Sequence, residues 1–243
     1  MKLFYTAVVA GVLITFASHS VAQQAYPTKA IRFIVPFPPG GSVNFFARLL
    51  GQKLSESWGQ SVLVDNRPGG NTIIGSEALV KSAADGHTLI LVTSSHAINP
   101  NLFPTPYDAI KDFAPVATTT SSGYILVLHP SVPSNTLREF IALAGSRPGQ
   151  LNYASVGVGG STHLASELFK AMTKTDLAHI PYKGSAPAMT DLLLGQVGLM
   201  WDSLTSSLPQ ARAGKLRALA VTGLLSLIRA AAALSAIRVD SDP

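Results

Sequence analysis

The hydrophobic positions follow two different spacings along most of the chain. The short apolar run Ile31–Pro36 is typical of a strand that is buried on both faces. From Val43 to Trp58 the apolar residues instead recur every three or four positions, which indicates an amphipathic helix. Strands and helices of this kind alternate through the sequence. The alternation predicts an α/β protein with parallel sheets joined by right-handed crossovers.

The same spacings predict the order of the elements. Strands are expected at Ile31–Pro36, Ser61–Val64, Thr88–Val92, Val116–Thr119, Tyr124–Leu128, Leu151–Ala154, Ala178–Pro181, Val197–Trp201 and Arg217–Val221. Helices are expected over residues 43–58, 72–82, 136–146, 162–173, 186–194 and 204–213. Thr136 and Glu139 form a capping box at the start of one of them. The Pro- and Ser-rich stretch Asn99–Ser122 has weak periodicity and marks a boundary between two α/β units.

The N-terminus has the pattern of a secretory signal peptide. Lys2 precedes the apolar run Leu3–Ala17, and Ser20-Val21-Ala22 forms a small-x-small cleavage site. We therefore expect residues 1–22 to be removed after Ala22 and the mature chain to fold outside the cytoplasm. An uncleaved anchor is the alternative, although the run is shorter than the roughly 20 residues that a membrane span needs.

The amino-acid composition excludes several kinds of functional site. The 243 residues include no cysteine, so disulfides, thiolate catalysis and cysteine zinc sites are excluded. The net charge of +5 comes from scattered basic residues, whereas a nucleic-acid groove needs a clustered patch. We expect no nucleic-acid partner, and a dispersed positive charge suits a small anionic ligand.

Two glycine- and hydroxyl-rich loops, Pro39–Ser42 and Ser155–Thr162, each connect a strand to a helix. The first amides of a helix have no partner within it, and the helix dipole is positive there, so such loops can bind an anion such as a carboxylate. Two of them at the ends of two sheets could hold the two ends of one molecule. The other reading, that the glycines only form tight turns, stays open.

Other motifs are incomplete. The sequence has no dinucleotide fingerprint, phosphate loop or nucleophile elbow. His163 and Glu167 could face a metal from one helix, but no third ligand is evident, so we expect no metal and no cofactor. Asp202 could cap a helix or accept a hydrogen bond from a ligand amine, and His96 could donate to a ligand or lie in a surface loop.

Several segments together resemble the substrate-binding proteins of tripartite tricarboxylate transporters, also called the Bug family. The resemblance runs from about Tyr26 to Thr222. It is carried by the segments Tyr26–Gly41, Asn66–Gly69, Asp85–Leu89, His96–Pro100, Leu151–Ser155, His179–Ala188 and Gly214–Thr222.

The resemblance implies a two-lobed, "Venus flytrap" periplasmic binding protein of the type 2 fold. Lobe 1 would comprise residues 23–122 and lobe 2 residues 123–222. The protein would act in the periplasm as a monomer, without catalysis, and would present a small carboxylate to membrane transporter subunits. The residues that would contact the ligand are Phe37, Pro39, Gly40, Gly41, Ser42, Ser94, Ser95, His96, Ser155, Gly157, Gly159, Ser161, Thr162, His163, Tyr182, Lys183, Gly184 and Asp202.

The sequence also departs from the family pattern. Asn44 stands where the family commonly has an aspartate, and residues 223–243 read as an atypical Ala/Leu-rich tail. Family members continue beyond this point to complete lobe 1, so we expect that completion to be largely missing here, through a truncation or frameshift. A non-functional remnant, or a secreted hydrolase or lyase using His163 or Asp202, is the alternative to a binding protein.

Overall fold

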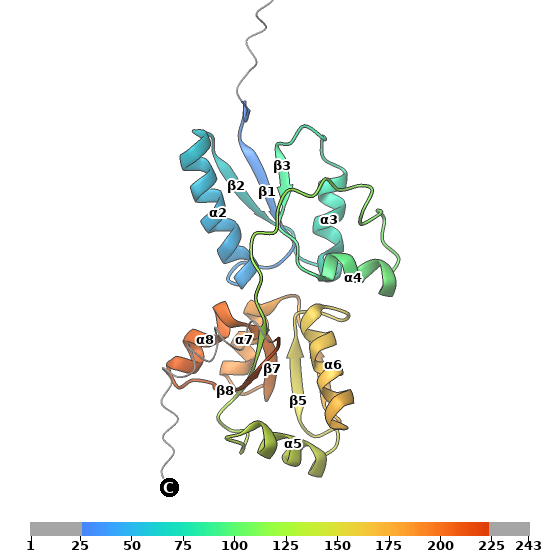
Figure 1. Ribbon diagram of the computed structural model, residues 1–243, viewed down its shortest axis with the longest axis vertical. Coiled ribbons are helices and arrows are strands. Elements are labelled where there is room, and N and C mark those ends of the chain that lie inside the picture. The colour runs from blue at the N-terminus through green and yellow to red at the C-terminus, as the bar shows by residue number, and fades with distance from the viewer. Residues whose placement is uncertain (1–25, 224–243) are drawn as a thin grey trace, which may run out of the picture.

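The first strand begins just inside the part of the chain that the structure describes. This structure is a computed structural model that describes residues 26–223, so the predicted signal peptide and all of the predicted tail except Gly223 lie outside the described residues. The chain forms two α/β lobes, which lie one above the other in Figure 1. Lobe 1 is the part that contains β1 to α4, and lobe 2 is the part that contains β4 to β8.

Lobe 1 contains a three-stranded parallel sheet in the order β2-β1-β3. Its elements are β1 (Ile31–Val35), α2 (Ser42–Trp58), β2 (Val62–Asn66), the 3-10 turn η2 (Gly70–Thr72), α3 (Ile73–Val80), β3 (Thr88–Ile90) and α4 (Ser95–Leu102). Ile34 of β1 pairs with Asp65 on one side and with Ile90 on the other. Figure 1 shows α2 and α3 on opposite sides of this sheet, which explains why β1 is apolar on both faces.

Lobe 2 contains a five-stranded sheet in the order β6-β5-β7-β4-β8. Its elements are β4 (Tyr124–Leu128), α5 (Leu137–Ser146), β5 (Asn152–Ser155), α6 (Ser161–Thr173), β6 (Ala178–Pro181), α7 (Ser185–Leu193), β7 (Leu199–Ser203), α8 (Leu204–Arg212) and β8 (Arg217–Val221). The capping box at the start of α5 is confirmed. The Thr136 hydroxyl accepts the amide hydrogen of Glu139 at 3.2 Å.

The expectation of purely parallel sheets is wrong for lobe 2. β4 pairs antiparallel with both of its neighbours, β7 and β8. The reason is topological: β4 carries the chain into lobe 2 from lobe 1 and runs away from the boundary between them, whereas β5 and β7 run toward it. Apolar spacing shows that a strand is buried but not in which direction it runs.

The segment between the lobes also differs from the expectation. No strand forms at Val116–Thr119, because that segment crosses between the lobes without a neighbouring strand, and Val116 is 84% exposed. The helix α4, which the weak periodicity of Asn99–Ser122 concealed, begins at Ser95 and contains Pro100. A strand needs a neighbouring strand to pair with, and the local pattern does not show whether one is present.

The core of lobe 2 lies on both faces of the central strands β4 and β7. Ile125 and Val127 pack with Met200 on one face, while Leu126 and Leu128 pack with Trp201 on the other. This alternation follows from the two-residue period of a strand. It fixes the carboxyl ends of β5 and β7, which carry Ser155 and Asp202, at the boundary with lobe 1. Within residues 26–223, no helix is long and apolar enough to cross a membrane.

Candidate functional site

A cleft lies between the two lobes and has two compartments. The larger has a volume of about 560 Å³ and the smaller about 430 Å³. Phe37, after β1, and Val156, after β5, line both compartments, so one residue from each lobe stands where the compartments meet. Both predicted strand-to-helix loops therefore contribute to one cleft.

About half of the residues that line the larger compartment carry a hydroxyl group, and they come from both lobes, while most of the others are apolar. The predicted ligand residues that line it are Phe37, Gly41, Ser42, Ser94, Ser161, Thr162 and Asp202. The sequence interpretation missed the run of hydroxyls Thr118–Ser122 in the crossing segment, and also Ser185, Ser203 and Thr205. Ser42 and Ser161 are the first residues of α2 and α6, so two helix N-termini face this space.

Asp202 is the one charged residue among the described residues that line the larger compartment. It is only 2% exposed, and its carboxylate accepts hydrogen bonds from the hydroxyls of Ser185 and Ser207, both at 2.8 Å. Ser206 donates to the same carboxylate. Asp202 therefore ties the first turn of α7 to α8. Asp202 does not cap α8 as predicted, because the N-cap residue is Ser203 and no side chain bonds to a backbone amide there. A contact between Asp202 and a ligand amine stays a prediction.

The smaller compartment combines four predicted residues with a segment that the sequence interpretation did not select. The predicted residues are Phe37, Gly157, Tyr182 and Lys183. The other lining residues are Pro36, the segment from Gly69 to Ile73, Phe103, Pro104, Val156 and Val158. Glycines between β2 and α3 carry the same strand–glycine–helix signal as the two selected loops, so that signal would have identified Gly69–Thr72. Lys183 is the one charged residue among the described residues that line this compartment.

Tyr182 is held against its own lobe. Its hydroxyl donates a 2.6 Å hydrogen bond to Asp191 on α7. Burial, followed by this hydrogen bond, raises the pKa of Tyr182 to about 12. The phenol therefore stays neutral at physiological pH. Tyr182 lines the compartment as an uncharged side chain whose position is fixed by the hydrogen bond to Asp191.

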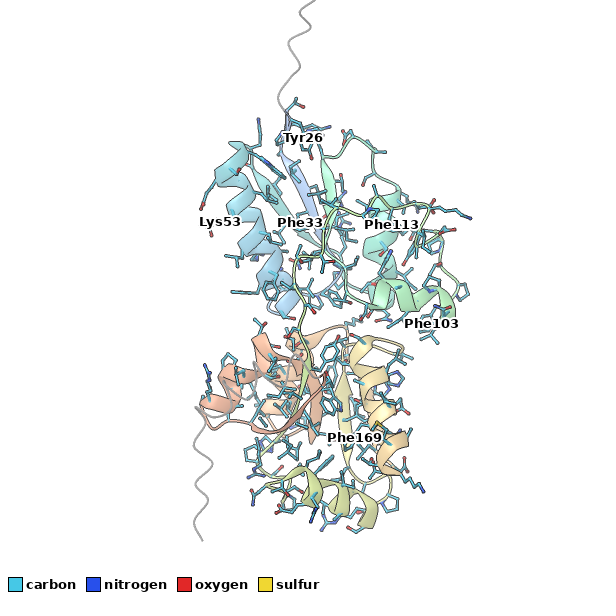
Figure 2. All side chains as sticks on the ribbon, viewed as in Figure 1. Tyr26, Phe33, Lys53, Phe103, Phe113 and Phe169 are labelled. Carbon is cyan, nitrogen blue, oxygen red and sulfur yellow. The ribbon has the colours of Figure 1, made fainter. Side chains whose placement is uncertain are left out.

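Several predicted glycines lie where the lobes touch. A Cβ atom placed on Gly159 would lie 2.7 Å from Leu102 and 2.9 Å from the ring of Phe103, both in lobe 1. One on Gly184 would lie 2.7 Å from Pro38, and one on Gly40 would lie 3.4 Å from Ala186. Figure 2 shows Phe103 at the edge of lobe 1 that faces lobe 2. These glycines permit a close approach between the lobes and do not line either compartment.

The remaining predicted residues lie outside both compartments. Pro39 and Ser95 do not line them, and Ser95 is fully buried. His96 lies 3.0 Å from the carbonyl oxygen of Ala109 and stacks on Tyr107, so it anchors the chain after α4 within lobe 1. A ligand contact by these three residues stays a prediction without support from their placement.

Ser155 and His163 belong to a polar stack beneath the lobe 2 loop. The rings of His163 and His179 lie 4.1 Å apart, and His179 stacks on Tyr153 at 4.9 Å. Ser155 Oγ lies 2.7 Å from His179 Nε2, and the Gly159 amide donates to His163 Nδ1 at 3.1 Å. The stack therefore positions the loop that faces lobe 1.

Protonation of this stack is disfavoured. Burial, and then the neighbouring His163 ring, lowers the pKa of His179 to about 4. Burial also lowers the pKa of His163, although Glu167 lies 3.9 Å away. The Glu167 carboxylate accepts hydrogen bonds from Tyr153 at 2.6 Å and from Lys170 at 2.9 Å. Among the described residues, no group of three metal-ligating side chains forms here or elsewhere.

Asn44 is linked through Asn66 to the loop that follows β1. It is 4% exposed, and its Nδ2 atom donates to Asn66 Oδ1 at 3.1 Å. Asn66 in turn donates to the Phe37 carbonyl oxygen at 2.8 Å. Asn44 lines neither compartment, and it contacts the loop after β1 only through Asn66.

Two lobes with a cleft between them, lined by helix N-termini from both, define a solute-binding protein. Residues 46–237 match the family described as "Tripartite tricarboxylate transporter family receptor". The chain belongs to this family, which consists of substrate-binding proteins and not of enzymes. The match extends into the segment that we expected to be atypical.

Several relatives, some of them of known structure, are similar to this chain over most of its length. The chain is 42% identical to the protein BugT of Bordetella pertussis over 83% of its own length and 63% of BugT. It is 38% identical to Rpa4515 of R. palustris, solved with adipate, with a TM-score of 0.79 over 81% of this chain and 67% of that one. It is 30% identical to MatC of Rhodopseudomonas palustris, solved with bound malate, with a TM-score of 0.76 over 82% of this chain and 68% of that one. The chain thus spans about two thirds of the length of such relatives.

Proposed function

We propose that this protein captures a small carboxylate between its lobes and presents it to membrane transporter subunits of the tripartite tricarboxylate type. The observation that carries the proposal is the cleft itself, where helix N-termini and hydroxyl groups from both lobes face one space. Helix N-termini stabilise anions through unpaired amides and the helix dipole. Relatives that share the fold were solved with adipate and with malate, and both are carboxylates.

The mode of action follows from the two-lobed architecture. Lobes that rotate about the crossing segment can close on a ligand, as in other periplasmic binding proteins. The contacts of Gly159 with Leu102 and of Gly184 with Pro38 would form only in the closed arrangement. We further propose that the protein acts as a monomer in the periplasm after cleavage of the signal peptide at Ala22, so that mature protein begins at Gln23.

A thermal-shift screen with a panel of mono-, di- and tricarboxylates tests the proposal. A ligand at 100 times its Kd should stabilise the folded chain by about 2.7 kcal/mol. For an acid that binds, Ser42→Ala removes a hydroxyl at the start of α2 and should weaken binding in isothermal titration.

Ser146→Ala is the matched control, because Ser146 lies at the end of α5, away from the cleft. Failure of every carboxylate to stabilise the protein would overturn the proposed function. Equal losses of affinity in the two serine variants would remove Ser42 from the site.

A further inference from the structure

Tyr124 lies where the crossing segment enters lobe 2. It is the first residue of β4, and the segment 114–123 leads directly into it (Figure 1). Its amide donates to Thr222 Oγ1 at 2.9 Å, and its carbonyl oxygen accepts the Thr222 amide hydrogen at 2.8 Å. The backbone of Tyr124 is therefore bonded in both directions to the end of β8, so its side chain leaves the sheet from a fixed position.

The Tyr124 side chain reaches the first turn of α6. Its hydroxyl donates a 2.6 Å hydrogen bond to Ser161 Oγ, which is within the usual range for two hydroxyl groups. Both residues are partly exposed, and both line the larger compartment of the cleft. One hydrogen bond thus links the residue that begins β4 to the residue that begins α6.

This bond determines which kind of hydrogen bond Ser161 can still make. A serine hydroxyl carries one hydrogen and can also accept. Ser161 Oγ accepts from Tyr124, and no hydrogen bond to another of residues 26–223 uses its own hydrogen. A hydroxyl that accepts one hydrogen bond becomes a stronger donor in the next. Ser161 is therefore available as a donor, and a carboxylate oxygen is the acceptor that binds such a donor most strongly.

The groups around Ser161 agree with a donor role. The N-cap residue of α6 is Gly160, which makes no side-chain bond to the first amides of the helix. The Thr162 hydroxyl is occupied, because it accepts the Val156 amide hydrogen at 3.0 Å. The nearby carboxylate of Asp202 accepts its hydrogen bonds from three other serines, those at positions 185, 206 and 207. The hydrogen of Ser161 is therefore not taken by the acidic residue of the same compartment.

We propose that Tyr124 is a positioning residue, which holds the Ser161 hydroxyl as a donor to a ligand carboxylate in the larger compartment. This proposal rests on the proposed function and assigns no ligand contact to Tyr124 itself. The competing explanation is that Tyr124 only stabilises lobe 2 by joining β4 to α6. The two explanations differ in whether the effect of Tyr124 on affinity depends on the hydroxyl of Ser161.

Isothermal titration of the full chain tests the proposal. The probe is the tightest-binding acid of a panel that includes acetate, succinate, malate and citrate. Ser161→Ala removes the donor and should weaken binding about ten-fold, the factor expected for a hydrogen bond to a charged group. Tyr124→Phe keeps the ring and removes only the hydroxyl, so it should weaken binding about five-fold.

Combined variants show whether Tyr124 acts through Ser161. Tyr124→Phe added to Ser161→Ala should change the affinity by less than about two-fold, because no hydroxyl is left to be positioned. Tyr124→Phe added to Ser42→Ala should keep its full effect, since Ser42 lies in lobe 1 and does not bond to Tyr124. A merely structural role of Tyr124 would weaken binding by the same factor in both backgrounds.

Tyr26→Phe is the matched control. The Tyr26 hydroxyl donates a hydrogen bond of the same length, 2.6 Å, to the Gly86 carbonyl oxygen. Figure 2 shows Tyr26 at the end of lobe 1 that lies away from lobe 2. This variant should keep the affinity of the unmodified chain. A loss as large as that of Tyr124→Phe would show that removing any bonded tyrosine hydroxyl weakens binding, and it would overturn the proposal.

The remaining outcomes separate this proposal from the proposed function. If an acid binds but Tyr124→Phe has no effect, or the same effect with and without the Ser161 hydroxyl, the positioning role is wrong and the proposed function stands. If Ser161→Ala binds as tightly as the unmodified chain, Ser161 is not a donor to the acid and the positioning role is again wrong. If no acid of the panel binds, both proposals are wrong.

Discussion

At the scale of single residues, glycine has two different roles in this cleft. Gly157 lines the smaller compartment, whereas Gly159 lies against Leu102 and Phe103 of the opposite lobe. Both have positive φ, and both are in one loop. A Cβ atom placed on Gly157 would lie 3.3 Å from Asn71 Oδ1, also in lobe 1, whereas one on Gly159 would meet Leu102 at 2.7 Å, so Gly159 tolerates a side chain less well.

Gly159→Val should therefore impair closure of the lobes. The added side chain would collide with Leu102 and Phe103, so affinity for a carboxylate should fall about ten-fold or more if closure contributes about 1.4 kcal/mol to binding. Isothermal titration with an acid identified in the screen measures this effect.

Gly214→Val is the matched control, because Gly214 has φ 70°, close to the 73° of Gly159, and has nothing within 4 Å of its Cβ position. Both variants should lose similar stability, on the order of 1–2 kcal/mol, from left-handed strain. Equal affinities in the two variants would contradict a role for Gly159 in closure.

At the scale of elements, α6 is joined to the sheet of lobe 2 through polar side chains as well as apolar ones. His163 of α6 stacks on His179 of β6, which stacks on Tyr153 of β5. Glu167 and Lys170, also on α6, are the charged groups beside these rings. The start of α6 and the loop before it thus depend on neutral imidazoles.

The stack should make lobe 2 less stable in acid. The unfolded chain takes up a proton at His179 near pH 6.5, whereas the folded chain does so only near pH 4. Between these values the unfolded state binds more protons, so the free energy of unfolding decreases as the pH falls from about 6.5 to about 4. Urea unfolding at a series of pH values measures the slope.

His179→Gln should flatten that slope, because glutamine stays neutral over the whole range. The control is His129→Gln, since His129 lies outside the stack and bonds to Ser131. An unchanged slope in His179→Gln would show that the acid sensitivity arises elsewhere in the chain.

At the scale of the whole molecule, the two lobes are unequal in the described residues. Lobe 2 has five strands, and residues Ile125–Leu128 of its interior strand β4 are fully buried. Lobe 1 has three strands, and β3 is only partly buried along its length. A larger buried core gives a larger free energy of opening.

Hydrogen exchange should therefore be slowest in β4 and β7 and faster in β2 and β3. Mass spectrometry of peptides covering these strands would measure the difference, with the peptide over the crossing segment 114–123 as the fast-exchanging reference. Equal protection of β3 and β4 would show that the two lobes unfold as one cooperative unit.

The sequence by itself determined the order of most elements in both lobes, but not the helix α4 or the absence of a strand at Val116–Thr119. Apolar spacing, glycine-containing turns and the Thr136 cap are local signals, so each could be assigned from neighbouring residues. The same signals placed Ser42 and Ser161 at helix N-termini, and the structure brings both to one compartment. The family resemblance, carried by local motifs, is confirmed by the match over residues 46–237.

Only the tertiary structure decided which of these local features face one another. The direction of β4 depends on where the chain crosses between lobes, and the role of Gly159 depends on Leu102, which is far away in the sequence. The orientation of the buried Asn71 side-chain amide depends on Asn99, whose Oδ1 atom accepts a hydrogen bond from Asn71 Nδ2. Burial, direction and hydrogen-bond satisfaction are properties of residue pairs brought together by folding, so they could not be assigned from either partner alone.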